Sequence, residues 1–349
     1  LVASDDYLSI LAAHMISAIV TAAACGMQMV ASLTPFPETL IVGRFITTVF
    51  SPLSDAALIL YFQEILPSSL RSTMSSQFST GYAVMCLLGM LLGHEDILGN
   101  SLPVLLFVLV IPGVIPTLII VLLPETPKFL TISRHDSDCA LASLAFYQGE
   151  HGALQAQLAN CSLKAKRSFH CIITTSHLRR AFALSIAALV GTLPFFPILQ
   201  NSTHFFTFLN MAQLSSSFLM VLLTFSCITS TFIVDKLPRM TMLLTVETSC
   251  LMFFSSFVLG AELGFKYMAV IGIFAFAFLY GVGVGPVAWS TPPELLPLQY
   301  RSAMFCLCYG FHSLLVVLTN FATVSLLGPT YPYAYRCVYV CKPSKTSQQ

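Results

Sequence analysis

Two short charged turns in this sequence have nearly the same residues and could form ion pairs. Residues 64–72 read EILPSSLRS and residues 294–302 read ELLPLQYRS, so Glu, Pro and Arg keep their spacing across the 230 positions between the copies. Carboxylate and guanidinium groups attract each other, but an exposed pair contributes only about 0–1 kcal/mol. Several such pairs can be made and broken at low cost. We expect the two turns to be equivalent parts of two halves that have the same orientation.

Arg44 and Asp55 are charged residues placed deep within apolar sequence. They are eleven positions apart, close to three helical turns, which puts both on one side of a helix about 16 Å apart along its axis. They are too far apart to pair. Charged groups at such depth usually face a partner or a water-filled space. Asp55 is therefore either a polar contact inside a bundle or a site linked to a solute or a proton.

No arrangement in the sequence is typical of a metal centre or an enzyme. Cys161, His170, Cys171 and His177 share one polar stretch, but their spacing matches no zinc-binding pattern. No set of nucleophile, base and orienting group is recognisable. The net charge is +1, and no basic block favours nucleic acid. We expect no metal, no cofactor, no nucleic-acid partner and no enzymatic activity.

The composition places these residues in a membrane. Of the 349 residues, 56% are hydrophobic and 9% are charged, whereas a soluble domain carries about 25% charged residues. A spanning helix needs about 20 apolar residues. The sequence therefore predicts an all-α membrane protein with about nine transmembrane helices, at residues 8–31, 39–62, 75–93, 102–123, 181–206, 211–234, 240–260, 267–290 and 303–327.

Lysine and arginine are concentrated in alternate loops, which predicts the orientation. With residue 1 in the cytoplasm, the cytoplasmic loops contain eleven of these residues and the outer connections before the tail contain only Lys266. The long polar stretch 124–180 is then cytoplasmic. The tail 328–349 would lie outside with Arg336, Lys342 and Lys345, against the bias. We therefore expect that a last helix and the sequence before Leu1 are missing from this chain.

Four ordered motifs resemble those of the major facilitator superfamily and, within it, the sugar porter family. GRFITTVFSPLSDAALILYFQEILPSSLR (43–71) is similar to the family's fourth helix and the loop after it, and PETPKFL (124–130) to its Pro-Glu-Ser-Pro-Arg signature. FIVDKLPRMTMLL (232–244) resembles the family's Asp-Arg-x-Gly-Arg-Arg loop. GVGVGPVAWSTPPELLPLQYRS (281–302) resembles its tenth helix, including the Gly-Pro-x-x-Trp motif.

The resemblance implies the major facilitator fold, with the nine segments corresponding to helices three to eleven of twelve. It divides the chain into a partial N-terminal bundle (1–123), a cytoplasmic central loop (124–180), a partial C-terminal bundle (181–327) and a short tail (328–349). Halves in parallel orientation are a known way of building secondary transporters, and they explain the repeated turn.

In the family, cytoplasmic acidic and basic residues latch the two bundles together while the central cavity is open to the outside. The matching latch positions in this chain are Glu64, Arg71, Glu125, Asp235, Arg239, Glu294 and Arg301. The loop after residue 234 departs from the family pattern, because Pro238 replaces a glycine and Met240 replaces an arginine.

The resemblance also implies a solute cavity lined by residues from several helices. Trp289 is the only tryptophan and occupies the position of the family's cavity ring, where Gly285 and Pro286 allow the helix to bend. A place in the aromatic belt at the membrane surface is the alternative for this ring. The predicted cavity residues are Arg44, Asp55, Gln200, Asn201, Gly285, Pro286, Trp289 and His312.

The amides that bind sugar hydroxyls in the family are replaced here. Their positions carry Val190, Gly191, Phe196 and Leu223, and a further asparagine becomes His312. Because unmade hydrogen bonds of buried hydroxyls are costly, a hexose is a poor fit to this chain. His312 is either a pH-sensitive pocket group or an interior histidine with satisfied hydrogen bonds.

From the family resemblance we expect a sugar-porter-like carrier, facilitative or secondary-active, that moves a small organic solute by alternating access in the plasma membrane. A carrier of organic ions or other non-sugar solutes is the first alternative. A non-transporting, sensor-like or truncated membrane protein is the second. The expected partners are the solute and the lipid bilayer.

Overall fold

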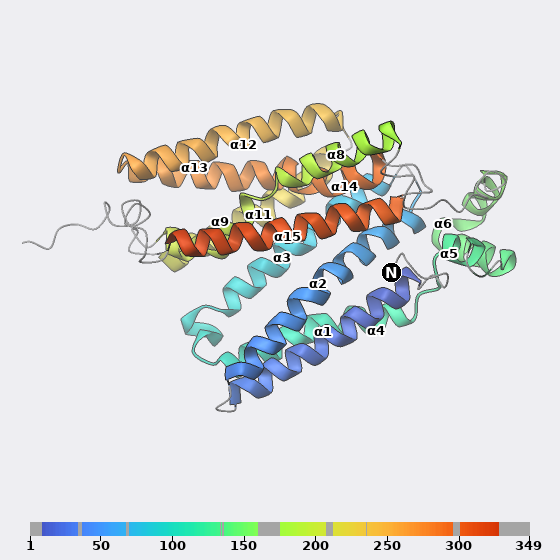
Figure 1. Cartoon of the computed structure of the whole chain (residues 1–349), viewed down its shortest axis with the longest axis horizontal. Helices are drawn as coiled ribbons and strands as arrows, with labels where there is room; N and C mark the ends of the chain where they lie inside the picture. Colours follow the sequence, from blue (N-terminus) through green and yellow to red (C-terminus); the bar gives the residue numbers. More distant parts are fainter. Residues whose placement is uncertain are drawn as a thin grey trace, which may run out of the picture. The chain divides into compact units, whose positions relative to one another are not determined.

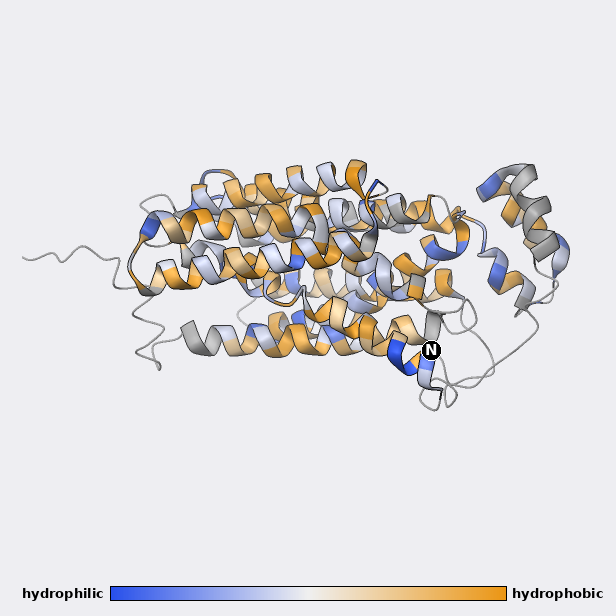
Figure 2. Cartoon of the chain, turned by 90° about the horizontal axis from the view of Figure 1, so that it is seen from above, coloured by the Kyte–Doolittle hydropathy of each residue, from blue (hydrophilic) through white to orange (hydrophobic). Residues whose placement is uncertain are grey.

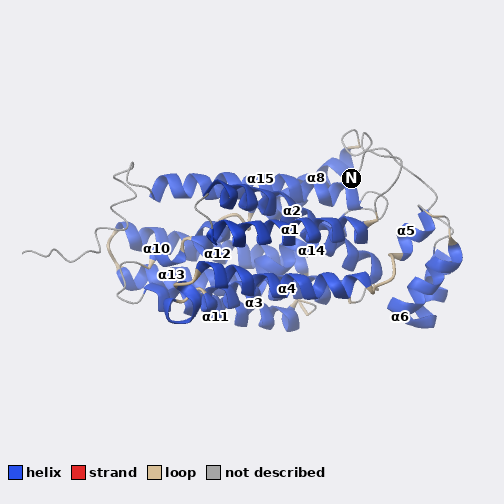
Figure 3. Ribbon diagram, turned by 90° about the horizontal axis from the view of Figure 1, so that it is seen from below, coloured by secondary structure: helices blue, strands red, loops and turns tan. Residues whose placement is uncertain are grey.

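The computed structural model describes residues 9–33, 37–67, 70–132, 134, 136–159, 175–206, 212–234, 236–295 and 301–327, and every regular element within them is helical (Figures 1 and 3). The first helices are α1 (Ile10–Leu33), α2 (Pro37–Ile65), α3 (Arg71–Leu92), the π-helical turn η1 (Glu95–Gly99), α4 (Leu102–Val121), α5 (Pro127–Ile132) and α6 (Ser137–Ala159). The later ones are α8 (Ser176–Val190), α9 (Phe195–Gln200), α10 (Ser202–Phe205), α11 (Ala212–Ile233), α12 (Arg239–Glu262), α13 (Lys266–Leu279), the π-helical turn η3 (Tyr280–Val284), α14 (Gly285–Leu295) and α15 (Arg301–Leu327).

The described residues contain eight stretches of helix that are long and apolar enough to cross a membrane, and a shorter apolar helix at Ser76–Leu92. Many residues along these helices are apolar (Figure 2). Large side chains such as Phe45, Phe232 and Phe321 are exposed on them, as expected where a helix meets lipid rather than water. Each of the nine predicted segments falls on a described helix, so the predicted all-helical membrane class is confirmed.

Two predicted segments are not continuous α-helices. Residues 181–206 divide into α8, α9 and α10, because the chain leaves the α-helix at Gly191 and resumes it after Pro194. Residues 267–290 continue from α13 to α14 through the π-helical turn η3, which contains Gly281 and Gly283. Interrupted helices inside a membrane normally line a cavity or a site.

Many hydroxyl side chains within the spans bond to their own helices. Thr48, Thr224 and Thr319 each donate to the carbonyl four residues earlier, at 2.8–2.9 Å. A hydroxyl that bonds in this way adds no unsatisfied polar group to an apolar surface. These spans can therefore carry many serines and threonines and still lie in a bilayer.

One compact unit is formed by the described residues of 1–75, 92–183 and 293–310. In it, α1 packs along α2 and α4, and a buried cluster joins Leu11, Tyr61, Ile65 and Ile120. Side chains of α6 form hydrogen bonds with the last turns of α2.

A chain of hydrogen bonds attaches α6 to the end of α2. The Tyr147 hydroxyl donates to the Pro124 carbonyl at 2.8 Å, so the Tyr61 hydroxyl is the donor in the 2.5 Å contact between the two phenols. The Gln148 amide donates to the Ile65 carbonyl at 2.8 Å, one of the carbonyls that the helix end leaves unpaired. Burial raises the pKa of Tyr147 above its ordinary value, so this phenol also stays a donor in alkaline solution.

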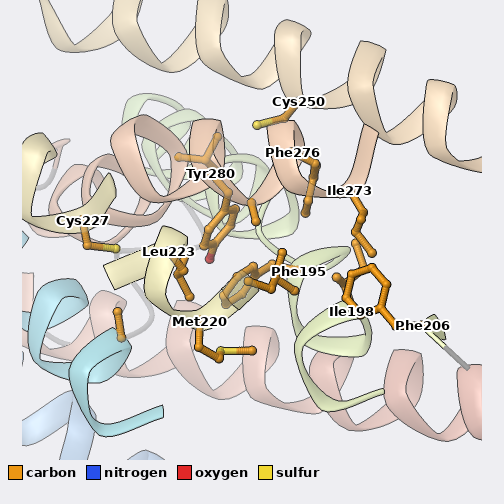
Figure 4. Packing of buried hydrophobic residues seen from close by; sticks show 14 residues of the cluster. Phe195, Ile198, Phe206, Met220, Leu223, Cys227, Cys250, Ile273, Phe276 and Tyr280 are labelled. Carbon is orange, nitrogen blue, oxygen red and sulfur yellow. The ribbon is translucent and has the colours of Figure 1, made fainter. Parts of the chain in front are cut away.

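The second compact unit is formed by the described residues of 76–91, 184–292 and 311–327. Its apolar core surrounds Tyr280 and Phe195, with Leu223, Phe276 and Cys227 nearby (Figure 4). Hydroxyls connect α3 with α11. The Thr80 hydroxyl shares its hydrogen between the Ser76 and Cys227 carbonyls, both at 3.3 Å, and the Thr224 hydroxyl shares its hydrogen between the Met220 carbonyl at 2.8 Å and the Ala83 carbonyl at 3.3 Å.

The two units do not follow the predicted division of the chain. Residues 76–91 group with the second unit and residues 293–310 with the first. The predicted bundles (1–123 and 181–327), the central loop and the tail therefore stay a prediction. The tail lies outside the described residues.

Glycines allow α12 and α13 to pack closely, which gives a test of this hairpin. A Cβ on Gly272 would lie 2.8 Å from the Phe257 nitrogen and 3.0 Å from the Phe253 carbonyl oxygen, so the backbone itself would have to move. We expect Gly272→Ala to destabilise the protein by about 1–3 kcal/mol. Thermal unfolding in detergent measures this loss.

Gly89→Ala is the matched control, because a Cβ there would meet nothing within 4 Å. Equal melting temperatures for the two variants would show that the close approach of α12 and α13 is wrong.

Candidate functional site

Three rings from three helices meet in the second unit. The indole of Trp289 on α14 lies edge-to-face against the imidazole of His312 on α15, with ring centroids 5.1 Å apart. The ring of Phe196 on α9 approaches the same imidazole at 5.7 Å. Trp289 and His312 are only 9% and 3% exposed. The structure thus places Trp289 in the protein interior and not in an aromatic belt.

The break after α8 supplies the polar partner of His312. Thr192 lies in this break, and its hydroxyl donates to the Leu189 carbonyl at 2.7 Å. Since that hydrogen is used, the 2.9 Å contact between the Thr192 hydroxyl and His312 Nε2 is donated by the histidine. Thr192 therefore satisfies a freed helix carbonyl and also fixes the position of the imidazole.

Stacked rings support the other side of the break. Phe195, the first residue of α9, stacks on Tyr280 with centroids 3.9 Å apart and planes 5° from parallel (Figure 4). Tyr280 opens the turn η3, where a Cβ on Gly283 would lie 2.7 Å from a methyl carbon of Val246. The stack joins the two interrupted helices, and Trp289 follows in the next turns of α14. We call Thr192, Phe196, Trp289 and His312 the ring site.

The predicted cavity residues do not all lie at the ring site. Trp289 and His312 do, and Gly285 and Pro286 are buried at the start of the helix that carries Trp289. Gln200 is exposed, and the Asn201 amide donates to the Pro197 carbonyl at 3.0 Å. The role of Gln200 and Asn201 in solute binding stays a prediction.

Arg44 and Asp55 belong to the first unit. Arg44 is exposed, and Asp55 accepts a hydrogen bond of 3.2 Å from the Tyr309 hydroxyl. The role of either residue in solute binding stays a prediction.

Two of the predicted latch residues have described side chains. Glu64 pairs with Lys128 at 3.0 Å, and its side chain is only 9% exposed. Glu125 accepts from the Ser9 hydroxyl at 2.9 Å, while its other oxygen is buried and has no hydrogen-bond partner in the described part of the chain. Sequence reasoning missed Lys128, although PETPKFL places it three positions after Glu125.

The other latch residues cannot be placed in this way. Asp235 lies outside the described residues, and so do the side chains of Arg71, Arg239, Glu294 and Arg301. The ionic latch stays a prediction.

Glu247 on α12 is another residue that the sequence reasoning did not select. It lies within the span Met240–Ala261. A Cβ on Gly191 would lie 3.0 Å from its Cδ and would collide with Oε1. Glu247 therefore fills the space beside the break after α8, at a position that only glycine leaves open. An acidic residue within an apolar segment is a signal that could have identified it.

The threonine in the break gives a test of the ring site. Thr192→Val removes the donor to Leu189 and the acceptor for His312 while keeping the side-chain shape. The Leu189 carbonyl, which also accepts from the Thr192 backbone N–H at 3.1 Å, and the His312 imidazole each lose one hydrogen bond, which we expect to cost about 1 kcal/mol in total. Thermal unfolding in detergent reports this loss, and the emission of Trp289 reports the local change.

Thr192→Ser is the control, because it keeps the hydroxyl. The assignment is contradicted if the serine and valine variants unfold at the same temperature.

The Lys128–Glu64 pair gives a second test. Lys128→Met leaves a mostly buried carboxylate without its cation, and because Lys128 is itself partly exposed we expect a loss of only about 1 kcal/mol. Limited proteolysis between residues 124 and 160 should become faster as α5 and α6 loosen.

Lys128→Arg should behave as the wild type, since it retains the charge. Unchanged proteolysis of the methionine variant would show that the pair does not hold this segment.

Comparison with known proteins gives the family. A family model described as "Sugar (and other) transporter" matches residues 6–341. The chain is 24% identical over 321 residues to chicken (Gallus gallus) solute carrier family 2, facilitated glucose transporter member 3, covering 88% of this chain and 62% of the relative. It is 24% identical over 313 residues to the human (Homo sapiens) member 4, covering 85% and 60%. The chain spans about three-fifths of the length of these curated relatives.

Solved structures agree on the fold. The proton:xylose symporter XylE bound to 6-bromo-6-deoxy-D-glucose aligns with a TM-score of 0.76 at 15% identity, over 95% of this chain and 77% of that one. A partially occluded, inward-open structure of the xylose transporter XylE from E. coli aligns with a TM-score of 0.68 at 15% identity, over 94% and 79%. At this identity the likeness shows the major facilitator fold alone. Because the family model extends over nearly all of the sequence, this integral multi-pass membrane protein belongs to the sugar (and other) transporter family.

Proposed function

We propose that the protein carries a small organic solute across a membrane by alternating access, without covalent chemistry. The observation that supports this most directly is the meeting of two interrupted helices at the ring site, in a chain of the sugar transporter family. Transporters commonly bind their solutes where discontinuous helices face each other near the middle of the bilayer.

Sugars are the first solute class to test. The relatives are named facilitated glucose transporters, and the solved structures concern a xylose carrier. The plasma membrane is the location we propose.

The chemistry of the ring site supports a second class of solute. Phe196 and His312 occupy positions where the family resemblance implies amides, and they lie against each other and Trp289. Rings offer apolar faces and few hydrogen bonds to a hydroxyl-rich molecule. A non-sugar solute with an apolar or planar part fits this site better than a hexose, and organic ions with such a part belong to this class.

Uptake into proteoliposomes tests the proposal. The panel is radiolabelled D-glucose, D-xylose, and aromatic amines and carboxylates. We expect saturable uptake of at least one member, reduced about tenfold or more by Trp289→Ala, since loss of a stacking ring costs of the order of 1.4 kcal/mol.

Phe321→Ala is the matched control, because Phe321 is an exposed ring on the same helix as His312. Absence of uptake for every solute by folded protein would overturn the carrier function. Trp289 fluorescence that still responds to a solute in that case would indicate a sensor.

Restoring amides tests the choice of solute. We expect the double variant Phe196→Asn and His312→Asn to bind D-glucose more tightly than the wild type by about tenfold for each hydrogen bond gained. Trp289 is the only tryptophan, so its fluorescence follows binding at the site directly. A wild type that binds D-glucose as well as the double variant would contradict the non-sugar interpretation.

A further inference from the structure

Asp55 lies in the interior of a membrane span. It belongs to the span Glu38–Ile65 and comes nine positions before Glu64, about 14 Å along the helix axis from that end. Its side chain is partly buried and bonds to a buried tyrosine of a distant part of the sequence. The Tyr309 hydroxyl donates to Asp55 Oδ2 at 3.2 Å, and Tyr309 is only 8% exposed. Asp55 therefore has a fixed donor from another helix of the same compact unit.

No cation compensates this carboxyl within the described residues. The ion pairs in that part of the chain are His94–Asp96 and Lys128–Glu64. Arg44 on the same helix is exposed and about 16 Å away along the axis. Moving a carboxylate from water into an apolar interior without a cation is expensive, and such a group normally gains a proton instead.

Few titratable side chains face α2 from the described elements that pack against it. From α1, His14 Nδ1 contacts the Ser54 carbonyl at 3.2 Å and the Ser54 hydroxyl at 3.0 Å, next to Asp55 in the sequence. From α15 comes Tyr309. The contacts of α5 and α6 with α2 include Lys128 and Tyr147, which bond to Glu64 and Tyr61 near the end of the helix. Only His14 and Tyr309 lie close to Asp55 among these titratable groups.

We propose that Asp55 is a proton-binding carboxyl, held by Tyr309, through which a proton enters the transport cycle. A proton from water adds to the carboxylate and leaves a neutral acid. The acid still accepts from Tyr309 through Oδ2 and gains one donor of its own. Rows of Asp, Glu and His inside membrane spans are the usual proton paths of pumps and transporters. Proton binding at Asp55 needs no solute, whereas its coupling to solute movement rests on the proposed function.

Infrared spectroscopy of the reconstituted full chain tests this proposal without a solute. A protonated carboxyl has a C=O stretching band that a carboxylate lacks. We expect the wild type to show such a band at low pH and to lose it as the pH rises. Asp55→Asn should remove the pH-dependent band, and Tyr309→Phe should keep it at a shifted frequency, because the carboxyl loses a hydrogen bond.

Glu247→Gln is the matched control, since Glu247 is another acid within a span but lies in the other unit. This variant should lose only the signal of its own carboxyl and should keep the band that Asp55→Asn removes and that Tyr309→Phe shifts. A band that survives in Asp55→Asn, or that Glu247→Gln removes instead, overturns the proposal, as does a wild type with no titrating band. Circular dichroism and elution in detergent confirm that each variant is folded.

This experiment separates the two proposals. A titrating Asp55 band together with no uptake of any solute would leave proton binding in place and reject transport. Uptake without the band would retain transport and reject Asp55 as the proton-binding group.

Discussion

A peptide group within the hydrocarbon of a bilayer has no water to bond with, so the backbone must satisfy itself. This requirement explains why every regular element in the described part of the chain is helical, and why side chains such as Thr192 and Asn201 bond to carbonyls where a helix is interrupted. At the largest interruption, Thr192 donates to the Leu189 carbonyl and accepts from His312. The same hydroxyl that repairs the helix end also fixes the imidazole. One side chain, Thr192, thus stabilises the broken end of α8 and positions a residue of the ring site.

The helical class and the position of the spans could be predicted because they depend on length and apolar content, which any window of sequence contains. The position of Trp289 in the interior also agreed with its Gly-Pro surroundings. Tertiary hydrogen bonds could not be predicted in the same way. The hydrogen bonds of the Asn201 amide to the Pro197 carbonyl and of Tyr309 to Asp55 depend on the folded chain, since Tyr309 is 254 positions from Asp55. The acidic residue Glu247 is visible within an apolar segment, but its place beside Gly191 is not.

The described ionic contacts are sparse and lie near the ends of helices. Lys128 neutralises Glu64, whereas Glu125 keeps one oxygen without a hydrogen-bond partner among the described residues. A charge that is already paired locally can hold a loop in place, and one that is only half satisfied is available to a second partner. Of these two glutamates, Glu64 therefore fixes α5, whereas the second oxygen of Glu125 is not used in the described part of the chain.

The π-helical turn Tyr280–Val284 contains one more residue in each hydrogen-bonded ring than an α-turn does. If that turn were to relax to α-geometry, every residue after it would rotate by about 100° around the axis without any bend in the helix. Trp289 would then leave His312 and face a different neighbour, while the glycines of the turn would permit the change sterically. The π-helical turn therefore sets the rotation of α14 about its own axis relative to α13.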